Sequence, residues 1–429
     1  MDKIKIAFNK PKISTNIIKL RNTINTIYNS IEFNDISINY NKMCIKNEQN
    51  ISIYNIFKYV YDNNLLSSSL NSYSLEKQTE FKSLIYNNDN NLTPWMNTNG
   101  KHIIREVNNL ARLKKIPSNL YNSKIDIDLI NEFVEMDILE YLLNKLEYKH
   151  QYSIKYNTIN INLVIYSKNK NINSKTLNNI IDRIIVIALY KIKKGYVKPL
   201  NINIDIFMTH FKKKINTHSK ILGSREINSG FATPFYKLCI FRKEELNKVL
   251  IHELIHYLEL DLNSHDQMFP DFYNYFNMNP KTEIRINEAY TETLAVTINS
   301  ILTTSTFTQF KKMIYNELKF SFYQVAKILD FYKFDNANDF FCTHKNDKFQ
   351  QNTSIFSYFI VKTAILYNLE LFYTHYHTNS ITVSNFKDFI ISIIHSEFVN
   401  IINKYMDHVT KHKQPITLYN CLKMTYNDN

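Results

Sequence analysis

The chain has 429 residues, of which 44% are hydrophobic, so it can bury a large core and is long enough for two or three domains. It contains 4 glycines and 8 prolines, which argues against a turn-rich all-β fold and favours long helices. The net charge of +13 favours anionic partners, but no aromatic and basic motif of a nucleic-acid module accompanies it. We therefore attribute the charge to lysines on a solvated surface and leave nucleic acid as a partner suggested by charge alone.

Cysteine spacing and hydropathy indicate the cellular compartment in which the protein is expected. The cysteines lie too far apart for a CxxC metal site or a disulfide scaffold, at Cys44, Cys239, Cys342 and Cys421. The first residues have no apolar segment typical of a secretory signal. The most apolar run, 180–189, contains charged residues and is too short to span a bilayer. We expect a soluble intracellular protein that is not secreted and has no membrane span; its oligomeric state stays open.

Residues 1–150 combine asparagine-rich polar stretches with segments of helical periodicity. Apolar residues recur at helical spacing in 102–113 and 126–148, which predicts helices there. Trp95 is interpreted as a packing anchor. We expect a mostly helical or irregular N-terminal region whose role the sequence does not indicate.

Strand and helix patterns alternate in residues 151–305, and helical patterns follow in 306–429. The first region predicts a small mixed sheet with helices, and the second predicts a helical subdomain, so the fold class is α+β. A turn at 228–230 leads into the last strand. In chain order, the predicted elements are a strand at 159–165, a helix at 173–190 capped by Asn173, strands at 201–208 and 235–241, and helices at 242–260, 283–301, 313–329, 355–372 and 386–406.

The segment His-Glu-Leu-Ile-His at 252–256 is the most informative motif. His252 and His256 are separated by one helical turn, so both imidazoles can bind the same zinc ion. Glu253 then points toward the open coordination position, where it can accept a proton from zinc-bound water. The motif therefore predicts a catalytic zinc site.

A catalytic zinc ion usually has three protein ligands, so a third must come from elsewhere. A metzincin would have a histidine six residues after His256, where this chain has Leu262, so that class is excluded. His265 lies in a polar loop and is interpreted as a surface residue. Glu288 and Glu292 are one turn apart on the next predicted helix, which suits one ligand and one carboxylate that orients a histidine.

With HELIH at 252–256 and NEAYTE at 287–292, the chain resembles the gluzincins, the thermolysin-like clan of zinc metallopeptidases. The resemblance covers roughly residues 158–300 and implies a zincin-like catalytic domain at 151–305. It implies one zinc ion per chain, with the ligands His252, His256 and Glu288.

The same resemblance implies that Glu253 is the general base. It also implies that Glu292 does not bind zinc but is the acidic residue that orients a ligating histidine. Glu288 follows His256 by 32 positions, which is longer than in compact gluzincins, so Glu292 stays a rival third ligand. Residues 228–261 and TSIFSYFIVK at 353–362 also resemble metallopeptidase-like proteins of nucleocytoplasmic large DNA viruses. That likeness implies a viral protein in the host cytoplasm or the virion.

These observations predict a zinc-dependent endopeptidase that acts on a protein or peptide. The hairpin near 229–233 would pair with an extended substrate as an added strand. Tyr358 is the first candidate to stabilise the oxyanion, with His375 and His377 as alternatives. Two other functions stay open: an inactive zincin-fold structural or virion component, and a basic nucleic-acid-associated protein.

Overall fold

The computed structural model describes residues 15–45, 145–215, 220–262, 284–341, 348–375, 383–411 and 415–427, with isolated positions in 6–13, 138–142 and 272–282. The predicted helix at 102–113, Trp95, His265, Cys342 and His377 lie outside the described residues.

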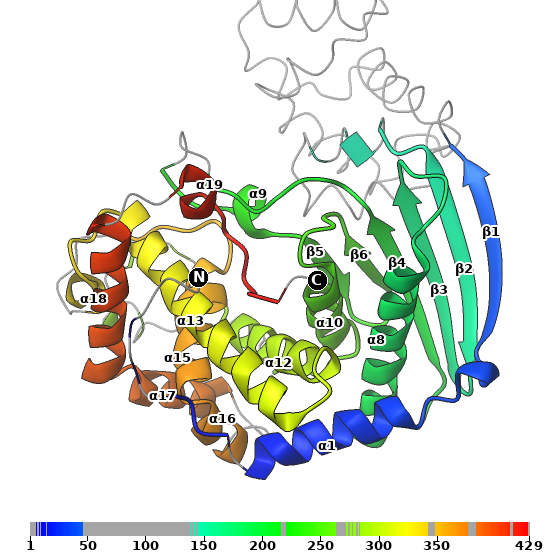
Figure 1. Ribbon diagram of the computed structural model, residues 1–429, viewed down its shortest axis with the longest axis horizontal. Helices are drawn as coiled ribbons and strands as arrows, with labels where there is room; N and C mark the ends of the chain where they lie inside the picture. Colours follow the sequence, from blue (N-terminus) through cyan, green and yellow to red (C-terminus); the bar gives the residue numbers. More distant parts are fainter. Residues whose placement is uncertain are drawn as a thin grey trace, which may run out of the picture.

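A mixed six-stranded sheet forms one side of the described molecule, with the strand order β1-β2-β3-β4-β6-β5 (Figure 1). Strands β3, β4 and β6 are parallel to one another, and the remaining pairs are antiparallel. β5 therefore lies at an edge of the sheet. The strands are β1 (Ser37–Cys44), β2 (Tyr148–Tyr156), β3 (Ile159–Ser167), β4 (Leu200–Phe207), β5 (Gly230–Thr233) and β6 (Lys237–Ile240).

The centre of the sheet is aliphatic on its buried positions. In the parallel register, Ile161 is opposite Ile202 and Ile165 is opposite Ile206, and all four side chains are buried. Helix α8 (Ser174–Lys193) makes the crossover between β3 and β4 that parallel strands require. Asn173 caps α8 by accepting a hydrogen bond from the backbone N–H of Thr176 at 3.2 Å, which confirms the predicted start of this helix.

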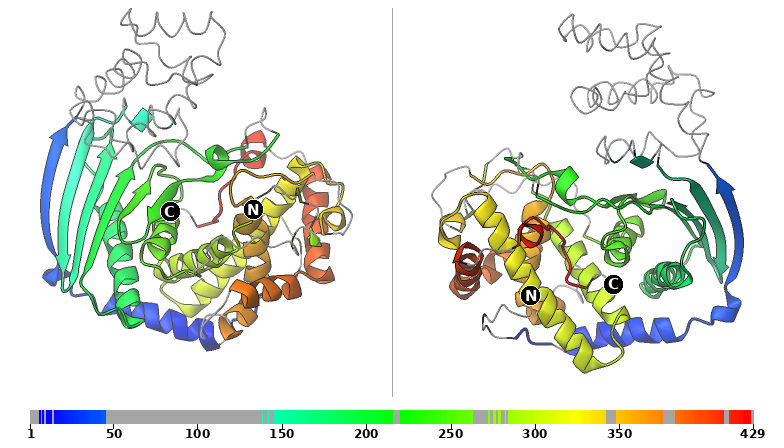
Figure 2. Two further views of the ribbon diagram at one scale, coloured as in Figure 1. Left: turned by 180° about the vertical axis from the view of Figure 1, so that it is seen from behind. Right: turned by 45° about the horizontal axis from the view of Figure 1, so that its top comes forward.

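The helices α8 and α10 (Leu246–Tyr257) lie against one face of the sheet, and α10 packs on α12 (Asn287–Leu302) (Figures 1 and 2). Helix α1 (Thr15–Asn29) packs on α8 and α12 and also on α16 (Leu369–His375). The other short segments are η1 (Phe33–Asp35), α9 (Ser224–Ile227), α14 (Ala337–Phe340) and α19 (Ile416–Tyr419), and the remaining helices are α13 (Phe307–Phe331), the π-helical segment η5 (Phe356–Val361), α15 (Lys362–Tyr367), α17 (Val383–Ile393) and α18 (Ser396–Lys411).

Two strands of the structure, β1 and β2, were not predicted from the sequence. β1 comes from the predicted N-terminal region and pairs along its length with β2, which spans the predicted boundary at residue 150. The buried positions of β2 include His150, Tyr152 and Tyr156, so its alternation is hidden from a search for aliphatic residues. Residues 37–44, from the predicted N-terminal region, therefore belong to the same sheet as the strands between residues 159 and 240.

Several predicted helices have different bounds in the structure, and the helix predicted at 355–372 is divided into η5, α15 and α16. The helix predicted at 242–260 begins at Leu246, because Glu245 has a left-handed backbone with φ of 60°. The helix predicted at 386–406 is divided into α17 and α18. The architecture is a mixed sheet followed by helices, which agrees with the predicted α+β class.

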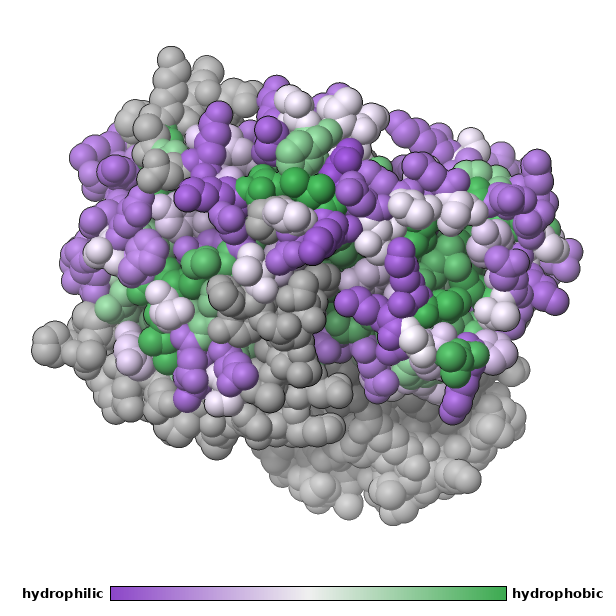
Figure 3. Space-filling view, turned by 90° about the horizontal axis from the view of Figure 1, so that it is seen from below, coloured by the Kyte–Doolittle hydropathy of each residue, from purple (hydrophilic) through white to green (hydrophobic). Residues whose placement is uncertain are grey.

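On the face seen from below, hydrophobic side chains form separate patches among hydrophilic ones (Figure 3). Within the described ranges, every helix is too short or too polar to cross a lipid bilayer.

Candidate metal centre

Helices α10 and α12 bring three potential metal ligands together. His252 and His256 lie one turn apart on α10, and Glu288 lies in the first turn of α12. On the other faces of α10, Leu250, Leu254 and neighbouring apolar residues are fully buried, which fixes the rotation of the helix. The sequence pattern of α10 therefore directs both histidines to the same side.

The three ligand atoms form an almost equilateral triangle. The Nε2 atoms of His252 and His256 are 3.2 Å apart, and each lies 3.3 Å from Oε2 of Glu288. A tetrahedral zinc ion, with bonds of about 2.0–2.1 Å to nitrogen or oxygen, places its ligand atoms roughly 3.3 Å apart. The triangle therefore has the dimensions of one face of a zinc tetrahedron.

Both histidines have a carboxylate at their second ring nitrogen. Nδ1 of His256 is hydrogen-bonded to Oδ2 of Asp261 at 2.6 Å, and Nδ1 of His252 lies 2.9 Å from Oε2 of Glu292. Such partners select the tautomer that leaves Nε2 free for a metal. Asp261 was not identified as a site residue in the sequence, although it follows His256 by five positions.

Glu292 contacts His252 at Nδ1 and is not part of the triangle formed by the two Nε2 atoms and Glu288. Its carboxylate also accepts hydrogen bonds from Nζ of Lys248 at 2.8 and 3.0 Å, and both side chains are buried. Among the described residues, the metal-type cluster contains Glu288 and omits Glu292. The geometry thus gives the two carboxylates the different positions that a ligand and its support would have.

The charges of this cluster depend on one another. Burial disfavours the charged form of His256, but Glu288 and Asp261 outweigh burial and hold the pKa of His256 well above its ordinary value. Burial likewise disfavours ionised Glu288, and the adjacent His256 and His252 hold its pKa well below the ordinary range. Because carboxylates surround both rings, the site stabilises positive charge, as a divalent cation would require.

Glu253 faces the same cavity beside β5. Its side chain is buried, and burial raises the pKa of its carboxyl group. A Cβ atom at Gly230 would lie 2.7 Å from the carbonyl oxygen of Cys239 and 3.1 Å from the side chain of Glu253. Glycine therefore allows the edge strand to approach the predicted general base closely.

Tyr358, the first candidate to stabilise the oxyanion, lies close to the cluster. Its ring centroid is 5.9 Å from that of His252, and it lies on the π-helical segment η5. Burial, followed by the charge of Glu288, raises the pKa of Tyr358 well above its ordinary value, so the phenol keeps its proton. His375 ends α16, but its side chain, like all of His377, lies outside the description.

These groups line one cavity with a volume of about 380 Å³. Its walls include β5, α10, the start of α12 and Tyr358, together with Met424 from near the end of the chain. Polar and apolar side chains both line it, which suits a polar reacting centre with adjacent space for a substrate side chain.

No protein-family model matches the chain, and no solved structure matches it. The chain is 25% identical to an uncharacterized protein of Acanthamoeba polyphaga mimivirus over 366 residues, which cover 75% of this chain and 90% of that relative. This similarity agrees with the predicted likeness to large-DNA-virus proteins at the level of a distant viral relative. The resemblance to gluzincins rests on the motifs at 252–256 and 287–292.

Proposed function

We propose that this protein is a zinc-dependent endopeptidase. The observation that carries the proposal is the triangle of His252, His256 and Glu288 atoms, whose 3.2–3.3 Å edges match a zinc tetrahedron. The carboxylates behind both histidines add support, because metal-binding imidazoles usually have such partners.

A bound zinc ion would polarise the scissile carbonyl and lower the pKa of its water toward about 7. Glu253 accepts the proton of the attacking water and returns it to the leaving amine. Its buried position beside the triangle supports this role. Tyr358 keeps its proton at neutral pH and donates a hydrogen bond to the developing oxyanion.

The substrate binds as an extended strand along β5. β5 pairs with β6 on one side and is the last strand of the described sheet, so its other side can pair with a peptide. Gly230 and Phe231 of β5 also line the cavity that contains Glu253. An added strand would thus bring its carbonyl groups past the general base.

The decisive experiment combines metal analysis with Glu253→Gln. Purified protein should contain close to one zinc equivalent, and a peptide library should reveal cleavage by the wild type. Glu253→Gln should keep zinc and fold but lose cleavage by at least about 100-fold, because glutamine cannot accept the proton. Glu370→Gln on α16 makes the same chemical change outside the cavity and should cleave normally.

Equal cleavage by Glu253→Gln and the wild type would disprove the mechanism. Zinc binding without cleavage of any peptide would instead favour a structural or virion component. Absence of zinc would leave salt-dependent nucleic-acid binding as the function to test.

A further inference from the structure

Residues 420–427, which we call the strap, run through the interior beside the metal centre. Leu422, Met424 and Thr425 are each at most 4% exposed. Cys421 forms an isolated antiparallel bridge with Lys214, and the backbone N–H of Leu422 donates to the carbonyl of Lys213 at 3.0 Å. The strap is therefore enclosed on several sides.

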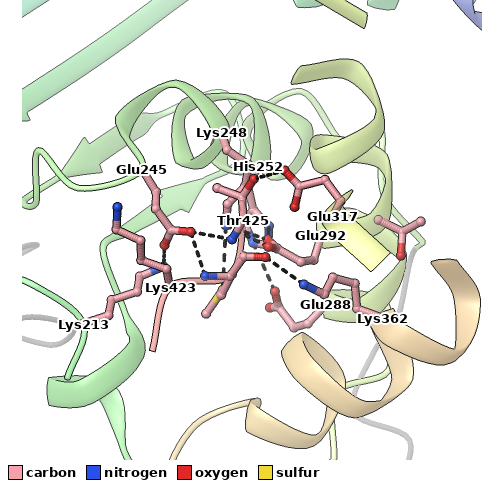
Figure 4. Close-up of polar contacts among 12 residues, drawn as sticks. Lys213, Glu245, Lys248, His252, Glu288, Glu292, Glu317, Lys362, Lys423 and Thr425 are labelled. Atoms are coloured by element: carbon pink, nitrogen blue, oxygen red, sulfur yellow. Dashed lines mark hydrogen bonds and ion pairs between the residues drawn. The ribbon is translucent and has the colours of Figure 1, made fainter. Parts of the chain in front are cut away.

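Buried charged side chains hold the strap through its backbone. Glu245 accepts hydrogen bonds from the N–H groups of Met424 and Thr425, both at 2.7 Å. Glu317 on α13 accepts three more from residues 425–427, at 2.6 Å from Thr425 Oγ1 and 2.9 Å from two backbone N–H groups. Figure 4 shows both carboxylates directed at Thr425.

Lysines complete this cluster. Lys362 donates to the carbonyl of Met424 at 2.8 Å, and Lys213 pairs with Glu245 at 2.7 Å. A buried charge is costly unless it is paired and hydrogen-bonded. Displacing the strap would therefore leave these charged groups exposed to solvent or buried without their hydrogen-bond partners. Glu245 also has a left-handed backbone at the start of α10, a conformation that non-glycine residues rarely adopt, and its carboxylate contacts the strap. The strap and the beginning of α10 therefore depend on each other.

The same contacts reach the metal centre. Sδ of Met424 lies 3.7 Å from Nζ of Lys248, which donates two hydrogen bonds to Glu292. Glu292 in turn lies 2.9 Å from Nδ1 of His252. Met424, Lys248 and Glu292 all line the cavity, and Lys248 and Glu292 are only 2% and 0% exposed, so the packing of Met424 helps to leave little of this pair accessible to water.

We propose that the strap is a regulatory part of the metal centre and that Lys248 is a positioning residue. Packed against Lys248, Met424 excludes water from the Lys248–Glu292 pair, and the pair holds His252 in its metal-binding orientation. Ordering of the strap and binding of zinc therefore stabilise each other. This inference rests on the proposed zinc site, and it adds control of that site by the far end of the chain.

Thermodynamic reciprocity gives a test on the unaltered protein. If strap order strengthens zinc binding, zinc must increase strap order by the same factor. Apo protein, prepared with a chelator, and zinc-loaded protein would be compared by amide hydrogen exchange. We expect the amides of 424–427 to exchange at least about 10-fold more slowly with zinc, while the amides of α18, which lies away from the cavity, change little. Equal exchange of the strap amides in both forms would refute the coupling.

Zinc affinity, measured by competition with a fluorescent chelator, tests the two contacts separately. Lys248→Met should weaken zinc binding by roughly 10–100-fold, as expected for a lost support of a metal ligand. Met424→Ala should weaken it by at least about 5-fold, because water then reaches the pair and reduces its strength. Met406→Ala on α18 is the matched control, since Met406 is 3% exposed and Met424 is 4% exposed.

The control should lose a similar amount of stability and keep its zinc affinity. Wild-type affinity in both Lys248→Met and Met424→Ala would overturn the inference while leaving the zinc peptidase proposal intact. If the wild type binds no zinc, the proposed function fails and the inference fails with it. If Lys248→Met does not fold, the exchange experiment still decides the question.

Discussion

Nδ1 of His256 lies 2.6 Å from the Asp261 carboxylate, just beyond the end of the helix that carries His256. Asp261 therefore orients His256 from one side of the triangle, as Glu292 orients His252 from the other. Two histidines of one motif thus have separate carboxylate supports that come from different segments. The orientation of the two histidines therefore depends on the turn after α10, which carries Asp261, as well as on α12, which carries Glu292.

Asp261→Ala should weaken zinc binding by roughly 10–100-fold, because His256 loses the partner that fixes its ring and tautomer. Chelator competition would measure the affinity. Asp407→Ala is the control, since Asp407 is exposed and pairs with Lys411 on the surface of α18. An unchanged affinity in Asp261→Ala would mean that the contact has no role in metal binding.

Glu288 and Glu292 should respond differently to substitution. Glu288→Ala removes a ligand atom and should nearly abolish zinc binding, whereas Glu292→Gln should weaken it by roughly 10–100-fold. Glu292→Gln should also cost about 3–5 kcal/mol of stability, because it leaves Lys248 buried without its ion partner. Zinc titration and urea unfolding would measure the two effects, and the reverse order of affinities would exchange the roles.

Gly230→Ala should reduce peptide cleavage by at least about 10-fold while zinc content stays close to that of the wild type. The added methyl group would collide with the carbonyl of Cys239, 2.7 Å away, so β5 must shift at the point where it passes Glu253. Gly223→Ala is the matched control, because its nearest neighbour would be 3.5 Å away. Equal kcat/KM for Gly230→Ala and the wild type would argue against substrate binding along β5.

Lys327 should produce a pH-dependent contribution to stability. Burial lowers its pKa from 10.5 to about 7 in the folded protein. Between pH 7 and the unfolded pKa, the unfolded chain binds more protons, so stability rises with pH by up to about 1.4 kcal/mol per unit. The free energy of unfolding in urea, measured for the wild type relative to Lys327→Met, should therefore increase from pH 7 to 9. The exposed Lys411→Met should show no such trend, and a flat difference for Lys327→Met would contradict the prediction.

Much of the fold was predictable where local patterns are strong. Alternating aliphatic residues at 159–165 predicted β3, and Asn173 predicted the start of α8; the structure confirms both. The adjacent β2 was missed because tyrosine and histidine occupy buried positions that aliphatic residues usually fill. The pairing of β1 with β2 joins residues about a hundred positions apart, and no local pattern contains that information.

The sequence alone determined which residue types share one helical face, because the spacing of 3.6 residues per turn is a local property. It therefore paired His252 with His256 and Glu288 with Glu292, and the place of Glu253 beside His252 in the motif made it the predicted general base. It could not decide which glutamate reaches the Nε2 atoms of the histidines, since that depends on the rotation and packing of α12 against α10. Tertiary structure placed Glu288 in the triangle and Glu292 beside Lys248. It also brought Asp261 and the strap to the site, because such contacts arise from loop geometry and from the burial of charges between distant segments.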